Sequence, residues 1–245
     1  MMKRFVFSIF LLPLLLASPQ TKAQGIMLTP KWTAQAQFTG YYVADKLGFY
    51  KEEGIDVCVQ HPAISESSFS FMEKGRAPVV IMNLSYAFME RLAGARVVNV
   101  MQTSQENSLM LISHSPLKGE ESLRNQKIAV WNHLSQKLLD RLAEHYALKQ
   151  VEWIRFNSGV NVFLSGAADP CLVGSYNEYL QLSEYGMNVD SIYSIRLADY
   201  GYNLPEDGLY VTEEFYNQYP EKPVCVVGHG PTSTVKKPSI WLWKK

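Results

Sequence analysis

The sequence has few cysteines and no excess of either charge, and these two shortages exclude several classes of protein. Its 245 residues include only three cysteines, Cys58, Cys171 and Cys225. They are widely spaced and none has the spacing of a metal ligand, which excludes a disulfide framework and a zinc module. The 23 basic and 23 acidic residues cancel to a formal net charge of +0, so nothing favours binding to nucleic acid or to an anionic membrane. We expect Cys58 and Cys171 to be small buried residues on strands.

The sequence also lacks the short motifs of common enzymes. It has no G-x-S-x-G nucleophile elbow, no glycine-rich phosphate loop and no His-x-x-x-His pair. We therefore predict no catalytic residue, no cofactor and no metal site. The histidines are scattered, and each fits a surface or capping role better than a catalytic one: His61, His114, His133, His145 and His229.

Residues 1–23 have the order of a secretory signal peptide. Lys3 and Arg4 precede an apolar run over residues 5–17, and a small polar segment ends near Ala23. The run is too short to span a bilayer comfortably, and no second such run follows. No cysteine lies near the expected cleavage point, so we predict an exported, periplasmic protein without a lipid anchor.

Apolar runs and helical periodicities alternate along the rest of the chain, with a polar connector at residues 103–107. This order predicts an α/β protein whose sheets are parallel and covered on both faces. Strands are expected at 26–32, 55–60, 79–82, 97–101, 109–113, 127–131, 151–156, 171–174, 191–196 and 208–211. Helices are expected at 65–74, 84–92, 135–148, 160–164, 176–185 and 212–219, the last capped by Thr212.

The most distinctive stretch spans residues 32–57. Its segment W-T-A-Q-A-Q-F-T-G-Y-Y-V-A, followed by K-L-G-F-Y-K-E-E-G-I-D-V, resembles the opening of one family. These are the substrate-binding proteins of bacterial ABC importers related to sulfonate and thiamine-pyrimidine-precursor binders. The resemblance implies the type II periplasmic-binding-protein fold, in which two α/β lobes enclose a ligand cleft. It places lobe I at residues 24–107 and 198–245 and lobe II at 108–197, with hinges near 103–109 and 196–202.

The resemblance also implies a function. It predicts a monomer that binds a small aromatic heterocycle, a thiamine-pyrimidine precursor or a related vitamin, and delivers it to an ABC permease in the inner membrane. Pyrimidine-precursor binders usually carry Asn and His where Gln35 and Phe38 stand here, so a flavin-type vitamin remains open.

Ligand sites in open α/β sheets lie beyond the carboxyl ends of the strands. Trp32 and Tyr42 are expected to stack on the ring, and Gln35 or Gln37 to meet its polar edge. Glu178 is expected to accept a hydrogen bond from an exocyclic amine, although a solvated helix position fits it equally well, and Trp131 also fits a core position. The candidate ligand-binding residues are Trp32, Gln35, Gln37, Tyr42, Asn83, Trp131, Asn177 and Glu178.

A competing function comes from the fungal thiamine pyrimidine synthases, which share this opening motif. The resemblance implies that these enzymes hold a pyridoxal cofactor as an imine on a lysine, beside a histidine. Matched through Gly75 and Gly94, the lysine position falls on Met82 and the histidine position on Tyr86. Their cysteine-rich iron-binding run is also missing from residues 198–207. The synthase is therefore the disfavoured alternative.

The end of the chain departs from the family pattern. Beyond residue 224 the family continues with a long helical stretch over lobe I. Here Gly228, Gly230, Pro231 and Pro238 forbid one continuous helix. Two interpretations stand open: a shorter family member with an irregular tail, or a chain whose normal ending was lost by truncation or frameshift, leaving lobe I incomplete.

Overall fold

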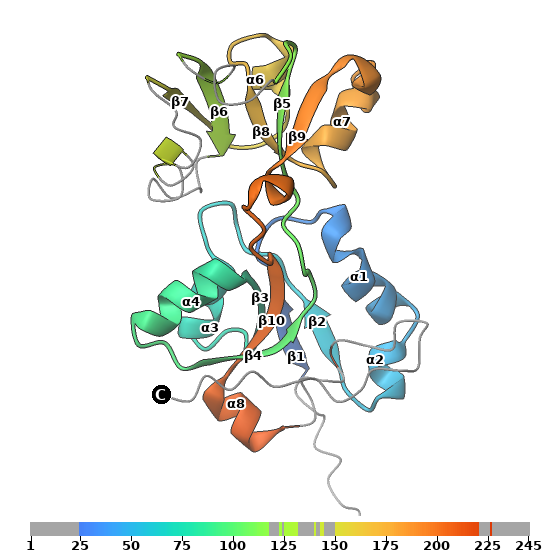
Figure 1. Ribbon diagram of the computed structural model, residues 1–245. Coiled ribbons are helices and arrows are strands. Elements are labelled where there is room, and N and C mark those ends of the chain that lie inside the picture. The colour runs from blue at the N-terminus through green and yellow to red at the C-terminus, as the bar shows by residue number, and fades with distance from the viewer. Residues whose placement is uncertain are drawn as a thin grey trace, which may run out of the picture.

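The computed structural model of the protein describes residues 25–117, 125–131 and 150–220, together with residues 123, 140, 143, 144 and 226. These residues form two lobes, each built on a five-stranded sheet (Figure 1). No helix within the described ranges is long and apolar enough to cross a membrane. Several expectations fall outside the described residues: the signal peptide, the helix at 135–148 apart from residues 140, 143 and 144, Cys225, the histidines His133, His145 and His229, and the chain end after 224 apart from Val226.

The first sheet has the strand order β2-β1-β3-β10-β4 and belongs to lobe I. Gly48, with φ 79°, supplies the left-handed turn that separates α1 from α2. The elements of this lobe are β1 (Ile26–Thr29), the 3-10 turn η1 (Ala36–Phe38), α1 (Thr39–Lys46), α2 (Phe49–Glu52), β2 (Val57–Val59), α3 (Ser68–Glu73), β3 (Val79–Asn83), α4 (Leu84–Leu92), β4 (Val97–Gln102), β10 (Asp207–Thr212) and α8 (Glu213–Gln218).

The second sheet has the strand order β7-β6-β8-β5-β9 and belongs to lobe II. Its elements are β5 (Leu109–Ser113), β6 (Lys127–Trp131), β7 (Glu152–Phe156), α6 (Asn161–Leu164), β8 (Cys171–Gly174), α7 (Glu178–Glu184), the 3-10 turn η3 (Val189–Ser191) and β9 (Tyr193–Arg196). The 3-10 turn η4 (Leu197–Tyr200) follows β9 and opens the segment that leaves this lobe. Short apolar runs bounded by turn residues therefore become strands, as the sequence predicts.

Each sheet contains one strand that runs against the others, so the expectation of purely parallel sheets is wrong. β10 is antiparallel to both β3 and β4, and β5 is antiparallel to both β8 and β9. Both strands begin where the chain arrives from the other lobe. Because that entry point lies at the carboxyl edge of the parallel strands, the arriving strand has to run in the opposite direction.

Alternating residues of the strands bury both faces of the first sheet. Val79 and Ile81 of β3 pack in the cluster that includes Phe38 and Tyr50, on the side of α1 and α2. Val80 of the same strand packs in a separate cluster with α3 and α4 (Figure 1). This period of two is the side-chain alternation of a strand, and it explains why both faces carry helices.

The two cysteines within the described residues differ in their surroundings. Cys171 on β8 is buried, as expected, and burial raises the pKa of its thiol to about 12, with Glu178 and Asp169 adding to the effect. Cys58 on β2 is exposed, so the expectation that it is buried is wrong. β2 lies at the edge of its sheet, and one side of it has no neighbour among the strands that the structure describes.

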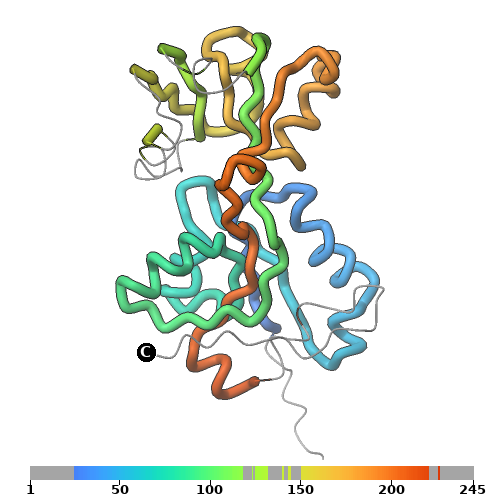
Figure 2. Tube along the Cα trace, viewed as in Figure 1, coloured from blue at the N-terminus to red at the C-terminus, as the bar shows by residue number. Residues whose placement is uncertain are grey.

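Two connectors, residues 103–108 and 197–206, join the lobes and run side by side at the waist of the molecule (Figure 2). The backbone N–H of Thr103 donates to the carbonyl of Asp207 at 2.9 Å, and the N–H of Asn107 donates to the side chain of Asn203 at 3.0 Å. Ser108 donates to Glu206 from both its N–H and its hydroxyl at 3.1 Å. The two connectors are therefore hydrogen-bonded to each other.

Candidate ligand-binding site

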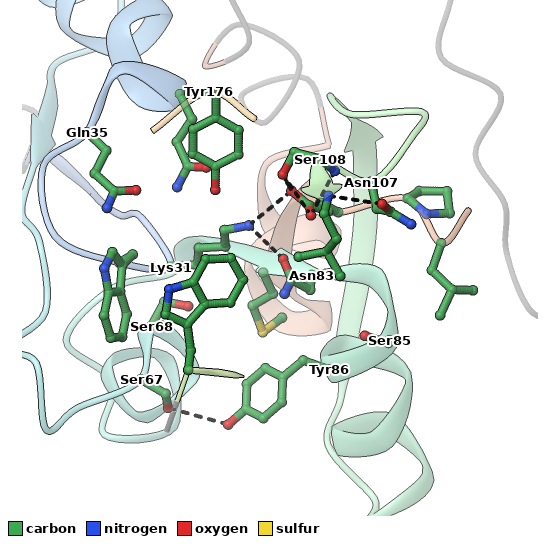
Figure 3. Close-up of a pocket in the computed structure, with 18 of the residues that line it drawn as sticks. Lys31, Gln35, Ser67, Ser68, Asn83, Ser85, Tyr86, Asn107, Ser108 and Tyr176 are labelled. Carbon is green, nitrogen blue, oxygen red and sulfur yellow. Dashed lines mark hydrogen bonds and ion pairs between the residues drawn. The ribbon is translucent and has the colours of Figure 1, made fainter. Parts of the chain in front are cut away.

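A cavity of about 580 Å³ lies where the two lobes and the two connectors meet. Its walls come from residues at or beyond the ends of β1, β2 and β3 in lobe I and of β6, β7 and β8 in lobe II. This is the edge at which ligands of open α/β sheets bind. The lining includes the aromatic residues Trp32, Tyr86, Trp131, Tyr176 and Tyr202 and the polar residues Lys31, Gln35, Gln37, Asn83, Ser108, Asn157, Glu178 and Glu206; Figure 3 shows part of it.

The structure brings most of the predicted site residues together in this lining. Trp32, Gln35, Gln37, Asn83, Trp131 and Glu178 line the cavity, whereas Tyr42 and Asn177 do not. Trp131 is at the same time largely buried and packs in the core of lobe II, so its side chain serves both the core and the cavity.

Tyr42 lies on α1 and does not line the cavity, but His61 links it to Trp32, which does. Its hydroxyl oxygen is 2.5 Å from Nε2 of His61, and Nδ1 of His61 contacts the carbonyl oxygen of Trp32. A carbonyl only accepts, so Nδ1 carries the hydrogen, and Nε2 of the neutral ring accepts from the Tyr42 hydroxyl. Tyr42 therefore supports the Trp32 segment through His61, and its position does not match stacking on a ligand opposite Trp32. His61 is a bridging residue rather than a surface or capping one.

Glu178 opens α7 and is only 6% exposed, so it is not a solvated helix residue. Its Oε2 accepts from the backbone N–H of Gly174 at 3.1 Å, and its Oε1 accepts from the side-chain amide of Asn177 at 3.0 Å. The amide oxygen of Asn177 accepts in turn from Gln181 at 3.1 Å. Asn177 thus orients Glu178 instead of facing the cavity, and each oxygen of Glu178 retains a second lone pair.

Lys31, at the end of β1, is the lysine of the cavity lining, and it is surrounded by acceptors (Figure 3). Its ammonium lies 2.8 Å from Oδ1 of Asn83 and 3.9 Å from Oε2 of Glu206, and it also pairs with the carboxylate of Asp207. The lysine and its two carboxylate partners are each less than a fifth exposed. Because solvent screens such partly buried pairs weakly, the positive charge is compensated within the protein.

Carboxylates outnumber the positive charge around the cavity. Besides Lys31, the described lining residues with a formal charge are Glu66, Glu178 and Glu206. Two of these carboxylates also act on Tyr176: burial raises the pKa of this phenol above its ordinary value, and Glu206 and Glu178, together with Asp207 outside the lining, raise it further. Tyr176 therefore keeps its hydrogen at neutral pH and is available as a hydrogen-bond donor.

Met82 and Tyr86 occupy the two positions that matter for the synthase alternative. Met82 is fully buried at the end of β3 and contributes to the cavity wall. Tyr86 on α4 lines the cavity as well, and its hydroxyl donates to Oγ of Ser67 at 3.4 Å (Figure 3). A thioether cannot form an imine, and a phenol is a poor substitute for an imidazole base.

Several lining residues were missed by the sequence reasoning. Lys31 directly precedes Trp32, and its place at the carboxyl end of the first strand was a usable signal. Ser108 lies in the expected hinge at 103–109, and Glu206 lies just beyond the expected hinge at 196–202. Tyr176 stands next to a predicted site residue. In a two-lobed protein the connectors border the cleft, so their polar residues are candidates from the outset.

Within the described ranges, no group of three or more His, Cys, Asp and Glu side chains is arranged to hold a metal ion.

Two lobes joined by paired crossings, with a cavity between them, define the type II periplasmic-binding-protein fold. The periplasmic aliphatic sulphonate binding protein SsuA of Escherichia coli superposes with a TM-score of 0.61 and 14% identity, over 79% of this chain and 63% of that one. PhnD1 of Prochlorococcus marinus, solved with methylphosphonate, superposes with a TM-score of 0.62 and 9% identity, over 84% and 83% of the two chains. At these identities the likeness shows the fold alone.

The profile of the NMT1/THI5-like family matches residues 35–224, and the chain belongs to this family. The riboflavin-binding protein RibY of Chloroflexus aurantiacus is 27% identical over 214 residues, covering 82% of this chain and 59% of RibY. The 4-amino-5-hydroxymethyl-2-methylpyrimidine phosphate synthase THI13 of Saccharomyces cerevisiae is 19% identical over 160 residues, covering 63% of this chain and 47% of the yeast protein. The chain thus spans about half the length of these curated relatives.

Proposed function

We propose that this chain is the solute-binding protein of an ABC importer, and that it takes a small aromatic heterocycle into the cavity between its lobes. The observation that carries the proposal is the lining of that cavity. Aromatic side chains and uncharged amides surround a volume of about 580 Å³, within the roughly 300–1,000 Å³ usual for small-molecule sites. The family and the fold support the same function class.

The charges of the cavity favour a neutral or amine-bearing ligand over an oxyanion. A phosphonate or sulfonate needs uncompensated positive charge or a row of free N–H donors. Lys31 is already paired with Glu206 and Asp207, and Glu178 adds a further buried negative charge. The ligand class therefore differs from the one named for the SsuA and PhnD1 neighbours.

The aromatic residues and the relatives narrow the class further. Trp32, Trp131 and Tyr86 provide ring faces on which a flat heterocycle stacks favourably. RibY is named for riboflavin and THI13 for a substituted aminopyrimidine. A thiamine-pyrimidine precursor or a flavin-type vitamin is consistent with these names. Export to the periplasm, a monomeric state and delivery to a permease complete the proposal.

An enzyme of the pyrimidine-synthase type is the second candidate, favoured only by the names of the yeast relatives. Met82 at the lysine position argues against it, because an imine with a pyridoxal cofactor requires a free amine. Lys31 lines the same cavity, but its ammonium is engaged by two carboxylates. We therefore propose binding without catalysis. Addition of pyridoxal phosphate should produce no imine absorption band. Appearance of that band would support the enzyme of the pyrimidine-synthase type instead.

The decisive experiment is native mass spectrometry of the purified protein, followed by calorimetry with a defined panel. The panel contains riboflavin and 4-amino-5-hydroxymethyl-2-methylpyrimidine as heterocycles, with methylphosphonate and ethanesulfonate as anionic controls. We expect a co-purifying aromatic compound or binding of at least one heterocycle, and no binding of the two anions. Tight binding of an anion, with neither heterocycle bound, would contradict the proposal.

A further inference from the structure

Gln37 differs from the other polar residues of the cavity because its carboxamide has nothing to bond to. It lies in η1, between β1 and α1, and it lines the cavity. Both its amide nitrogen and its amide oxygen are shielded from solvent, and neither has a hydrogen-bond partner among the residues that the structure describes. Its neighbour Phe38 is fully buried in the core of lobe I, so the backbone that carries Gln37 is firmly anchored.

Other polar groups that line the cavity have hydrogen-bond partners within the protein, unlike the amide of Gln37. Lys31 is bonded to Asn83, Tyr86 to Ser67, and Glu178 to Gly174. Buried polar groups in folded proteins are almost always paired, and an unpaired one has lost its hydration without compensation. An amide left in this condition beside a cavity is explained if the molecule that fills the cavity supplies the missing partners.

We propose that Gln37 is the specificity-determining residue of the cavity, and that it selects ligands whose ring edge places a hydrogen-bond donor next to an acceptor. This inference rests on the proposed function and names the chemical class of its ligand. A carboxamide presents one acceptor and one donor side by side, and its complement is a lactam or imide edge, or an amidine edge. Glutamine forms a bidentate pair of this kind with adenine in nucleic-acid recognition.

The amide is able to reach such an edge at little cost. Gln37 is one of the residues that line the cavity, and the residue as a whole is only partly buried although its two amide atoms are shielded. In the ligand-free protein the amide gives up no hydrogen bond when it turns. The amide has already lost its hydration during folding, so a ligand that satisfies both atoms gains more than it would at a hydrated group. A ligand without the edge misses that gain and therefore binds more weakly.

The inference predicts opposite effects of one substitution on stability and on binding. Gln37→Met keeps the length of the side chain and removes both orphaned atoms, so the ligand-free variant should melt at a higher temperature than the wild type. The same variant should bind the matching heterocycle about tenfold or more weakly. Gln35→Met is the matched control: Gln35 lines the same cavity, but its amide is not among the buried unpaired groups, so this change should not raise the melting temperature.

The probes are riboflavin, which carries an imide edge, and 4-amino-5-hydroxymethyl-2-methylpyrimidine, which carries an amidine edge. Riboflavin is compared by calorimetry with its N3-methyl analogue, and the aminopyrimidine with its 4-dimethylamino analogue, so that each analogue lacks the N–H donor of the edge. Wild type should prefer the unmethylated probe, and Gln37→Met should lose that preference. If Gln37→Met loses stability and affinity together, or keeps the wild-type affinity and preference, Gln37 is not the selecting residue and the binding function still stands. If the wild type binds neither probe, the proposed function fails and this inference fails with it.

Discussion

At the scale of single residues, the aromatic wall depends on a support that does not touch the cavity. Trp32 lines the cavity, while His61 contacts its carbonyl oxygen and Tyr42 bonds to the far nitrogen of His61. Phe38 packs beside the same imidazole, with ring centroids 5.5 Å apart. A hydrogen bond and an aromatic contact thus hold the loop after β1 in one conformation. Trp32 and Tyr42 are expected to affect binding to different degrees for this reason.

Trp32→Ala should weaken binding of the heterocycle by about 1–3 kcal/mol, because truncating an aromatic side chain removes its stacking contacts. Tyr42→Phe should leave the cavity wall in place and reduce stability by about 0.5–1.5 kcal/mol, the usual net value of one hydrogen bond. Calorimetry and urea unfolding of both variants, with riboflavin and the aminopyrimidine as probes, measure the two effects. An affinity loss for Tyr42→Phe as large as that for Trp32→Ala would contradict the supporting role of Tyr42.

The two cysteines of the described ranges should differ sharply in reactivity. Burial raises the pKa of Cys171 to about 12, so at pH 8 this thiol holds its proton, and only the thiolate is nucleophilic. Cys58 is exposed on β2. Iodoacetamide at pH 8 should therefore modify Cys58 in the native protein and Cys171 only after unfolding. Peptide mass spectrometry after timed alkylation gives both rates, and equal rates in the native protein would be inconsistent with a buried Cys171.

The residues of the cavity show how far sequence reasoning reaches. Trp32, Gln35 and Asn83 were predicted because loops at the ends of parallel strands approach one edge, which is a property of the fold class. Tyr42, which is predicted to stack on the ligand, is not among the lining residues. A helix turns successive side chains by about 100°, and the sequence alone does not say which direction faces the cleft. The orphaned amide of Gln37 was invisible, since hydrogen-bond satisfaction depends on neighbours that are distant in the chain.

At the scale of elements, the local sequence patterns predicted where helices and strands lie along the chain, but not in which direction two of the strands run. The structure has α4 at Leu84–Leu92, β5 at Leu109–Ser113 and β8 at Cys171–Gly174, with the predicted bounds. The two strands are compact apolar segments flanked by polar or turn residues, and α4 shows the apolar spacing of a helix. The antiparallel orientation of β5 and β10 was missed, because it is decided by which edge of a sheet the crossing chain enters and not by the strand's own residues.

The last described helix, α8, depends on its predicted cap. Oγ1 of Thr212 accepts from the backbone N–H of Phe215 at 3.1 Å, which satisfies one of the unpaired donors of the first turn. Thr212→Ala should therefore cost about 1 kcal/mol of stability, whereas Thr212→Ser, which keeps the accepting oxygen, should cost much less. Urea unfolding of the two variants decides the matter. Equal losses would mean that the methyl group of Thr212, and not its hydroxyl, stabilises this end of lobe I.

At the scale of the whole molecule, the Lys31 cluster links the ligand site to the connectors. Lys31 belongs to lobe I and lines the cavity, while Glu206 and Asp207 stand where the second connector enters β10. Glu206 also accepts two hydrogen bonds from Ser108 in the first connector. Any movement of the connectors therefore acts on groups that border the bound ligand.

Lys31→Met should be strongly destabilising, because it leaves two partly buried carboxylates without their cation. We expect a loss of about 3 kcal/mol in the free energy of unfolding. Adding Asp207→Asn to this variant removes one of the uncompensated charges and should recover part of the loss. Urea unfolding of the single and double variants tests the idea, with Asp207→Asn alone as the control. A double variant no more stable than Lys31→Met would show that the charges are not the cause.

The cavity is lined from both lobes, so a ligand that contacts both should favour the conformation in which they are closest. A ligand shifts such an equilibrium only as far as its affinities for the two conformations differ. We expect the connectors at residues 103–108 and 197–206 to act as the hinges, since both are short and they are hydrogen-bonded to each other. Saturation with whichever heterocycle binds should therefore lower the radius of gyration measured by small-angle X-ray scattering, and methylphosphonate should leave it unchanged. Binding confirmed by calorimetry without a change in radius would mean that the lobes are already closed before the ligand enters.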